Sequence, residues 1–158
     1  MQITRRREAP RDEAFLRRMV TDSIARELGA EAWPEPMRGH LLGIQVDARR
    51  QSHRANYPDA ASYVIEADGR DAGWIVVMTM PHEVRLVEIM VAAEFRGQGI
   101  GSAAIGEVLA AAESAGKPVR LHVNVTNGGA IRLYERLGFR RIDGNEVQHL
   151  MERAVEKD

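Results

Sequence analysis

The chain has 158 residues, of which 44% are hydrophobic and 28% are charged, and its formal net charge is −1. This balance is typical of a single globular domain, and the near-zero net charge gives no field that would favour nucleic acid or an anionic membrane as a partner. The absence of cysteine excludes a disulfide scaffold, a thiol nucleophile and a thiolate metal site.

No window holds the roughly 18 apolar residues that a membrane helix needs. The charged N-terminus also lacks the apolar core of a signal peptide. We therefore expect a cytoplasmic protein with no membrane partner and no bound metal, and the sequence leaves a homodimer open.

Hydrophobic spacing and chain breakers define the elements of the first half. A short strand is expected over residues 2–7, and apolar residues then recur at helical spacing over 12–28, where Gly29 ends the pattern. A loop with two prolines leads to a second helix over 36–56, whose expected apolar stripe is Met37, Leu41, Ile44 and Ala48.

The second half alternates strands and helices. Gly116 and Gly138 each follow an expected helix, in the position that favours glycine. The expected strands are 62–67, 71–80, 84–91, 119–125, 139–143 and 146–154, and the expected helices are 99–115 and 128–137.

The element order is therefore β-α-α-β-β-β-α-β-α-β-β. Strand–helix–strand crossovers require local parallel pairing, whereas consecutive strands joined by tight turns pair antiparallel. We predict an α/β fold with a mixed sheet. No linker-like stretch divides the chain, so we expect one domain over residues 1–158.

Three glycines stand where the helix over 99–115 begins, in the stretch EFRGQGIGSAAI at residues 94–105. A helix N-terminus has backbone N–H groups without internal partners and a partial positive charge. Glycines there let an anion approach the backbone, and Arg96 adds a positive charge nearby. The stretch predicts a phosphate or pyrophosphate site.

Neither common nucleotide motif fits this stretch. A Walker loop needs a lysine after its last glycine, and a dinucleotide fingerprint needs a different glycine spacing and an acidic residue at the end of the next strand. Here Ser102 follows Gly101, and the next strand ends in Asn124-Val125-Thr126-Asn127.

The pattern R-x-x-G-x-G from Arg96 to Gly101 resembles the acyl-CoA pyrophosphate loop of the GNAT superfamily of N-acetyltransferases. The segment VTNGGAIRLYERLGF, residues 125–139, is similar to that family's N-x-x-A-x-x-L-Y-E-x-x-G-F segment. The resemblance covers about residues 85–153. It implies a GNAT-like fold and acetyl transfer from acetyl-CoA to an amine by direct attack.

The resemblance implies an acid, a base and a cofactor path. Tyr134 would protonate the leaving thiolate, and Asn127 would reach the pantetheine arm while capping its helix. Further cofactor contacts are implied for Ile89, Met90, Val91, Arg96, Gly97, Gln98, Gly99, Ile100, Gly101 and Ser102, with one backbone N–H of residues 89–91 as the oxyanion donor.

Two residues are candidates for the general base. Glu88 interrupts an otherwise apolar strand, where a charge is costly unless it faces a cleft or a partner. His122 lies in the strand over 119–125, and histidine titrates near neutral pH. The two could act together through a water, and the structural alternative is that Glu88 pairs with Arg85 or Arg120.

The acceptor side is expected over about residues 12–56, and the acetyl-CoA-binding core over about 84–154. The acceptor is a primary amine of a small molecule, a peptide or a protein, and nothing in the sequence identifies it. Two alternatives remain, a non-catalytic acyl-CoA-binding regulatory module on the same fold and a nucleotide-binding domain.

Overall fold

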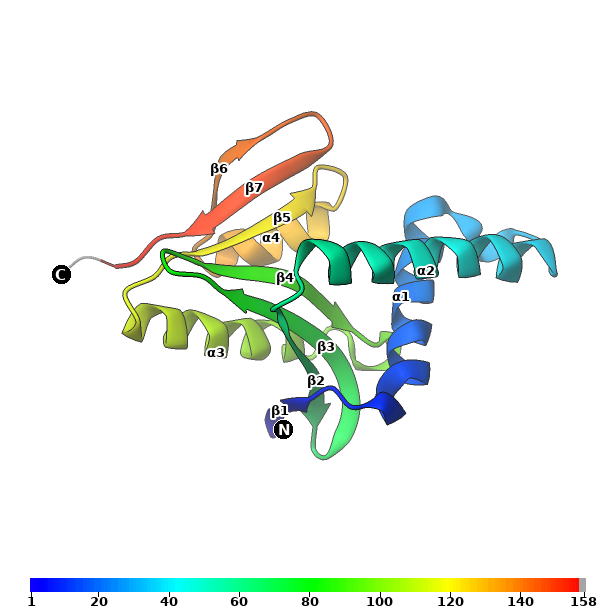
Figure 1. Cartoon of the computed structure of the whole chain (residues 1–158), viewed down its shortest axis with the longest axis horizontal. Helices are drawn as coiled ribbons and strands as arrows, with labels where there is room; N and C mark the ends of the chain where they lie inside the picture. The colour runs from blue at the N-terminus through cyan, green and yellow to red at the C-terminus, as the bar shows by residue number, and fades with distance from the viewer. Residues whose placement is uncertain (157–158) are drawn as a thin grey trace. The chain divides into compact units, whose positions relative to one another are not determined.

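The computed structural model describes residues 1–156 (Figure 1). Its helices and strands follow the order predicted from the sequence, and each of their ends lies within one or two residues of the predicted position. They are β1 (Ile3–Arg7), α1 (Glu13–Leu28), α2 (Met37–Asn56), β2 (Ala61–Ala67), β3 (Arg70–Thr79), β4 (Val84–Val91), α3 (Ile100–Ser114), β5 (Val119–Asn124), α4 (Gly128–Arg136), β6 (Arg140–Gly144) and β7 (Gln148–Arg153).

The strands form one seven-stranded mixed sheet in the order β1-β2-β3-β4-β5-β7-β6. The pairings of β2 with β3, β3 with β4, β5 with β7 and β6 with β7 are antiparallel. The pairing of β4 with β5 is parallel, as the crossover through α3 requires. The predicted α/β fold with a mixed sheet is confirmed.

Strand β4 leaves its parallel neighbour after two register pairs. Val84 is opposite Val119 and Arg85 is opposite Arg120, and no further β4–β5 pair follows although both strands continue. On its other side, β4 has a bulge at Val87, because Val76 is opposite Glu88 and Val77 is opposite Leu86. The edge of β4 from Leu86 onward is thus open toward β5.

The chain forms two compact units, one of residues 1–6 with the chain from Ala60 onward, and one of residues 7–59. In the first unit, α3 packs against β3 and β4 (Figure 1). Its core is built from the alternate apolar residues of the strands and one face of α3, including Ile65, Ile75, Leu86, Ile100, Ile105, Leu121 and Met151. The expectation of one domain over the whole chain stays a prediction.

In the second unit, α1 buries the residues predicted from its helical spacing, Leu16, Met19, Val20 and Ile24 among them. The predicted stripe of α2 is wrong, because Met37, Leu41 and Ile44 are exposed. The buried residues of α2 are instead Leu42, Val46 and Arg50.

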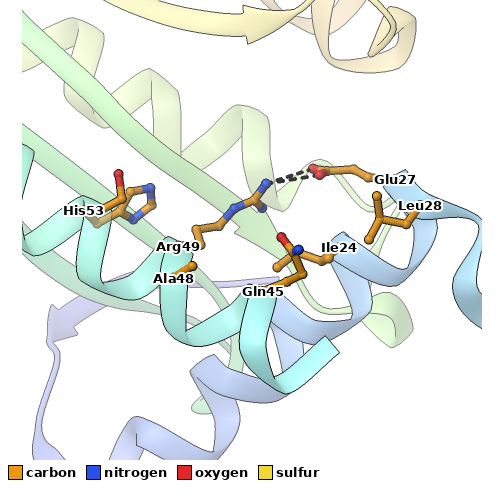
Figure 2. Close-up of a pocket in the computed structure, with 8 residues that line it drawn as sticks. Ile24, Glu27, Leu28, Gln45, Ala48, Arg49 and His53 are labelled. Carbon is orange, nitrogen blue, oxygen red and sulfur yellow. Dashed lines mark hydrogen bonds and ion pairs between the residues drawn. The ribbon is translucent and has the colours of Figure 1, made fainter. Parts of the chain in front are cut away.

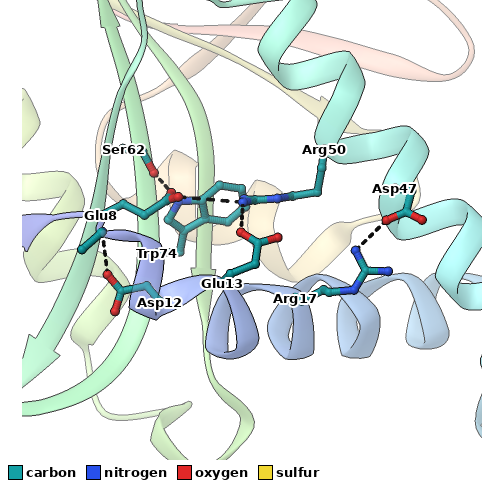
Figure 3. A network of polar contacts seen from close by, with 9 residues as sticks. Glu8, Asp12, Glu13, Arg17, Asp47, Arg50, Ser62 and Trp74 are labelled. Carbon is teal, nitrogen blue, oxygen red and sulfur yellow. Dashed lines mark hydrogen bonds and ion pairs between the residues drawn. The ribbon is translucent and has the colours of Figure 1, made fainter.

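Arg50 belongs to this buried face because its charge is paired. Its Nη2 lies 2.7 Å from Glu13 Oε2 at the start of α1 and 3.8 Å from Glu8 Oε2 (Figure 3). Burying a cation without such a partner would be costly. A second ion pair, from Arg17 Nη1 to Asp47 Oδ1 at 2.6 Å, also joins α1 to α2 (Figure 3).

Candidate active site

The three predicted glycines line a surface hollow of about 370 Å³. Gly97 and Gly99 have φ values of +75° and +79°, a region that L-residues with a side chain rarely adopt. They turn the chain from β4 into α3. The hollow is lined by Val91, Phe95, Arg96, Gly97, Gly99, Ile100, Gly101, Ser102, Leu133 and Arg136.

Gly101 differs from Gly97 and Gly99, because its φ is not positive. Its backbone conformation therefore does not explain why it is a glycine. A Cβ added to it would meet only Val91 Cγ2 at 3.7 Å, an ordinary van der Waals distance. Neither the backbone nor the packing of the chain therefore requires a glycine at this position. The missing side chain leaves the first turn of α3 open to the hollow.

The first-turn N–H groups of α3 have no side-chain cap, since the N-cap residue is Gly99. Arginine side chains lie on two edges of the same hollow. Arg96 follows β4, where its Nε donates to the carbonyl of Val91 at 3.2 Å, and Arg136 lies in α4. Exposed amides and two guanidinium groups make the hollow suited to an anion.

Sequence reasoning missed Leu133 and Arg136 as members of this hollow. The two residues are three positions apart in a helix and therefore lie on the same face. That spacing could have shown that they belong together. It could not show that α4 presents them to the start of α3. Gln98 does not line the hollow, and its Nε2 donates to the carbonyl of Glu94 at 3.4 Å.

Asn127 caps α4 as the sequence predicted. Its Oδ1 accepts a hydrogen bond from the Ala130 amide at 3.2 Å. The cap fixes the start of the helix that carries Leu133, Tyr134 and Arg136.

Tyr134 is buried in α4, with its ring centroid 5.8 Å from that of Phe139. Burial and, to a lesser extent, the nearby charge of Glu88 raise the pKa of Tyr134 to about 12. The phenol is therefore protonated at neutral pH and has a proton to donate. The influence of Glu88 also shows that β4 and α4 bring these two predicted site residues near each other.

Glu88 lies on the open part of β4, just after the bulge. Its Oε1 accepts a hydrogen bond from the backbone amide of Ile89 at 3.2 Å. The Ile89 amide is thus the one among residues 89–91 that donates to a side-chain carboxylate. The carbonyl of Val91 accepts a hydrogen bond from Arg96 Nε.

His122 lies in β5, on the strand face opposite the buried Leu121 and Val123. Its Nδ1 is 3.3 Å from Arg85 Nη1. Partial desolvation and the charge of Arg85 lower the pKa of His122, and the charge of Glu83 opposes them in part. The imidazole is therefore mostly neutral at pH 7.

Glu83, Arg85, Arg120 and Glu152 form a polar cluster with His122 that sequence reasoning missed. Arg85 Nε lies 3.0 Å from Glu83 Oε2, and Arg120 bridges Glu83 Oε1 at 3.4 Å and Glu152 Oε2 at 2.8 Å. Three separate strands and a turn contribute to it. No local spacing pattern could have identified such a set.

A second cavity, of about 390 Å³, lies within the unit of residues 7–59, between α1 and α2 (Figure 2). Arg49 crosses it to reach Glu27, with Nη2 3.1 Å from Oε2. His53 also lines this cavity. Burial is the main cause that lowers the pKa of His53, and the charges of Arg49 and Arg50 lower it further.

Within residues 1–156, no helix is long and apolar enough to cross a membrane. The same part of the chain holds no group of three or more His, Asp or Glu side chains placed to bind a metal.

Comparison with known proteins defines the class. Residues 18–139 match the model of the acetyltransferase (GNAT) family, so the chain belongs to this family. A structure of the PaiA N-acetyltransferase from Thermoplasma acidophilum, in complex with coenzyme A, aligns with a TM-score of 0.73 over 98% of this chain and 99% of its own, at 18% identity.

Two curated relatives share closer sequence similarity over part of their length. An uncharacterized N-acetyltransferase of Methanocaldococcus jannaschii is 38% identical over 85 residues, which cover 49% of this chain and 38% of the relative. An N-alpha-acetyltransferase of Sulfurisphaera tokodaii is 31% identical over 98 residues, which cover 53% of this chain and 59% of the relative. In both cases the chain spans less than two thirds of the relative's length.

Proposed function

We propose that the protein is an N-acetyltransferase that moves an acetyl group from acetyl-CoA to the primary amine of a small molecule, a peptide or a protein. The observation that carries the proposal is the hollow at the start of α3, with its uncapped amides, its two arginines and the side-chain-free Gly101. Family membership and the coenzyme A complex of the PaiA structure support it.

The donor side is built from three segments. Residues 97–102 hold the pyrophosphate through backbone N–H groups, with Arg96 and Arg136 as its cationic partners. Residues 89–91, on the open edge of β4, bind the thioester end of the pantetheine arm. Asn127 at the start of α4 is the third contact proposed for the pantetheine arm.

Glu88 is the proposed base, because its carboxylate lies on the open edge of β4. It takes a proton from the amine, whose nitrogen forms a bond to the acetyl carbon. The Ile89 amide, which donates to Glu88 in the free protein, then donates to the developing oxyanion. The carbon–sulfur bond breaks, and the Tyr134 hydroxyl gives its proton to the leaving thiolate, so that CoA departs as the thiol.

The charge of Glu88 couples the two proton transfers of this reaction, from the amine to Glu88 and from Tyr134 to sulfur. It is the second cause of the high pKa of Tyr134. When Glu88 takes the amine proton, that charge is neutralised and the Tyr134 phenol becomes a stronger acid. The proton that Tyr134 gives to sulfur therefore becomes easier to transfer at the moment when it is needed.

One observation favours the second candidate, a non-catalytic acyl-CoA-binding module. A phenol with a pKa of about 12 is a weaker acid than a free phenol, and a thiol has a pKa near 8.5. A module that only binds acyl-CoA needs no acid at this position.

A thiol-release assay with acetyl-CoA and a panel of amines and peptides separates the two candidates. We expect turnover, and we expect Tyr134→Phe to lower kcat by about 10²-fold or more, the usual contribution of a general acid, while acetyl-CoA binding is retained. Binding without turnover on any acceptor would favour the module. Unchanged turnover in Tyr134→Phe would remove Tyr134 from the mechanism.

A further inference from the structure

His122 has one ring nitrogen bound to an arginine. Arg85 Nη1 lies 3.3 Å from His122 Nδ1. A guanidinium has five N–H donors, no acceptor, and does not lose its proton in proteins. In this contact Arg85 donates, so Nδ1 must carry a lone pair rather than a proton.

The other ring nitrogen follows from this assignment. A neutral imidazole has one N–H, and with Nδ1 as the acceptor its proton is on Nε2. The ring nitrogen that does not contact Arg85 is therefore a hydrogen-bond donor. A base at this position would need a lone pair on Nε2, which requires the opposite tautomer and the loss of the Arg85 contact.

The surroundings hold Arg85 in this orientation. Its Nε is bound to Glu83 Oε2 at 3.0 Å, and the other oxygen of Glu83 accepts from Arg120, which also binds Glu152. The charges that act on His122 are those of Arg85 in β4 and Glu83 just before β4. Arg120 on β5 and Glu152 on β7 extend the ion-pair cluster. The cluster keeps the Arg85 guanidinium against Nδ1, and this cation disfavours protonation of the ring.

We infer that His122 is not the general base but a hydrogen-bond donor to the acceptor, selecting amines that have a carbonyl oxygen next to the amino group. The inference rests on the proposed function. His122 lies just beyond the last β4–β5 pair, Arg85 with Arg120, and Glu88 lies on the open stretch of β4 that follows the same pair. A carboxylate for the ammonium and an N–H for a carbonyl match an α-amino amide, such as the N-terminus of a peptide.

The tautomer can be read directly, without substrate. Long-range ¹⁵N–¹H correlation spectra of the uniformly labelled protein distinguish a protonated ring nitrogen from a lone-pair nitrogen. We expect His122 to show Nε2–H and a lone pair on Nδ1. In Arg85→Met, which removes the donor, we expect a mixture of tautomers and a rise in the pKa of His122. An Nδ1–H ring in the unaltered protein would overturn the inference.

Kinetics test the substrate class. The readout is the ratio of kcat/KM for a peptide with a free α-amino group to kcat/KM for an alkylamine of similar length. We expect His122→Leu to lower this ratio about tenfold, the value of one hydrogen bond of roughly 1.4 kcal/mol, and His122→Gln, which keeps an N–H donor, to restore most of it.

His149→Leu is the matched control, because His149 pairs with Val123 in the register of β7 and so lies on the other face of the sheet from His122. It should keep the unaltered ratio. If His122 is the base, His122→Gln should lose turnover on both acceptors, and the fall in rate at low pH caused by protonation of the histidine should disappear. That result would overturn the inference.

Calorimetry with acetyl-CoA keeps this test separate from that of the proposed function. A protein that binds no acetyl-CoA overturns the proposed function and the substrate class with it. Tight acetyl-CoA binding together with an Nδ1–H ring overturns the assignment of His122 alone.

Discussion

Neither the backbone conformation nor the packing of this chain requires a glycine at position 101, and the proposed ligand gives a reason for one. The φ of Gly101 is not positive, and a Cβ there would make only an ordinary contact with Val91. Alanine is a better helix former than glycine by up to about 1 kcal/mol. We therefore expect Gly101→Ala to leave the protein as stable as before or more stable, and to weaken acetyl-CoA binding at least tenfold, as measured by calorimetry and urea unfolding.

Gly106, one and a half turns further along α3, is the control. A Cβ added there has no neighbour within 4 Å, and the residue lies outside the hollow. Gly106→Ala should raise stability without changing the Kd for acetyl-CoA. Equal affinity of Gly101→Ala and the unaltered protein would show that the pyrophosphate does not approach this turn.

Tyr134 gives a second prediction, in the pH dependence of stability. The pKa of Tyr134 is raised to about 12 in the folded protein, and that of an unfolded tyrosine is about 10. The stability that this shift contributes is fully present below pH 10 and is lost as the pH rises from about 10 to 12. Urea unfolding measures the loss of unfolding free energy between pH 8 and pH 11. We expect this loss to be about 1.4 kcal/mol larger for the unaltered protein than for Tyr134→Phe.

Glu88→Gln tests the cause of this shift. Without the carboxylate charge, the phenolate absorbance that Tyr134 contributes should appear at a lower pH than in the unaltered protein. Burial, the larger cause, still keeps the pKa of Tyr134 above its ordinary value. An unchanged titration would show that Glu88 and Tyr134 do not interact.

At the scale of elements, α2 shows where sequence reasoning fails. The stripe Met37, Leu41, Ile44 and the stripe Leu42, Val46, Arg50 both have helical spacing, and hydrophobicity favours the first. The second is buried because Glu13 and Glu8, more than thirty residues away in sequence, neutralise Arg50. The ends of helices were predicted well because they depend on local residues. Gly29 and Gly116 end their helices with φ values of +64° and +69°, which favour glycine.

The two stripes of α2 can be separated by substitution. Leu42 is 1% exposed and Leu41 is 40% exposed. We expect Leu42→Ala to cost about 2–4 kcal/mol of unfolding free energy, and Leu41→Ala to cost less than about 1 kcal/mol. Thermal and urea unfolding of the two variants side by side give the comparison. Equal losses would mean that the face of α2 is wrongly assigned.

Strand β4 is predictable in its bounds but not in its environment. Its apolar run defined residues 84–91 from the sequence, and Glu88 stood out within it. The bulge at Val87, the open edge and the bond from the Ile89 amide to Glu88 depend on the neighbouring strands. The same is true of the arginine contact that sets the tautomer of His122.

At the scale of the whole molecule, the order of elements was enough to predict a mixed sheet, because a strand–helix–strand crossover allows few pairings. That the glycines of this turn line one hollow was also predictable, since they lie in six consecutive residues, and their role as an anion site stays a prediction. Arg136 and Leu133 were not predictable, because only the fold brings α4 beside the start of α3.

The central claim is that the hollow at α3 binds the pyrophosphate of acetyl-CoA, and unfolding with ligand present tests it most directly. At about 100 times its Kd, acetyl-CoA should raise the unfolding free energy by roughly 2.7 kcal/mol. At the same concentration, S-acetylpantetheine, which lacks the pyrophosphate, and NAD should add little. Stabilisation by NAD or S-acetylpantetheine equal to that by acetyl-CoA, or none by acetyl-CoA, would contradict the claim.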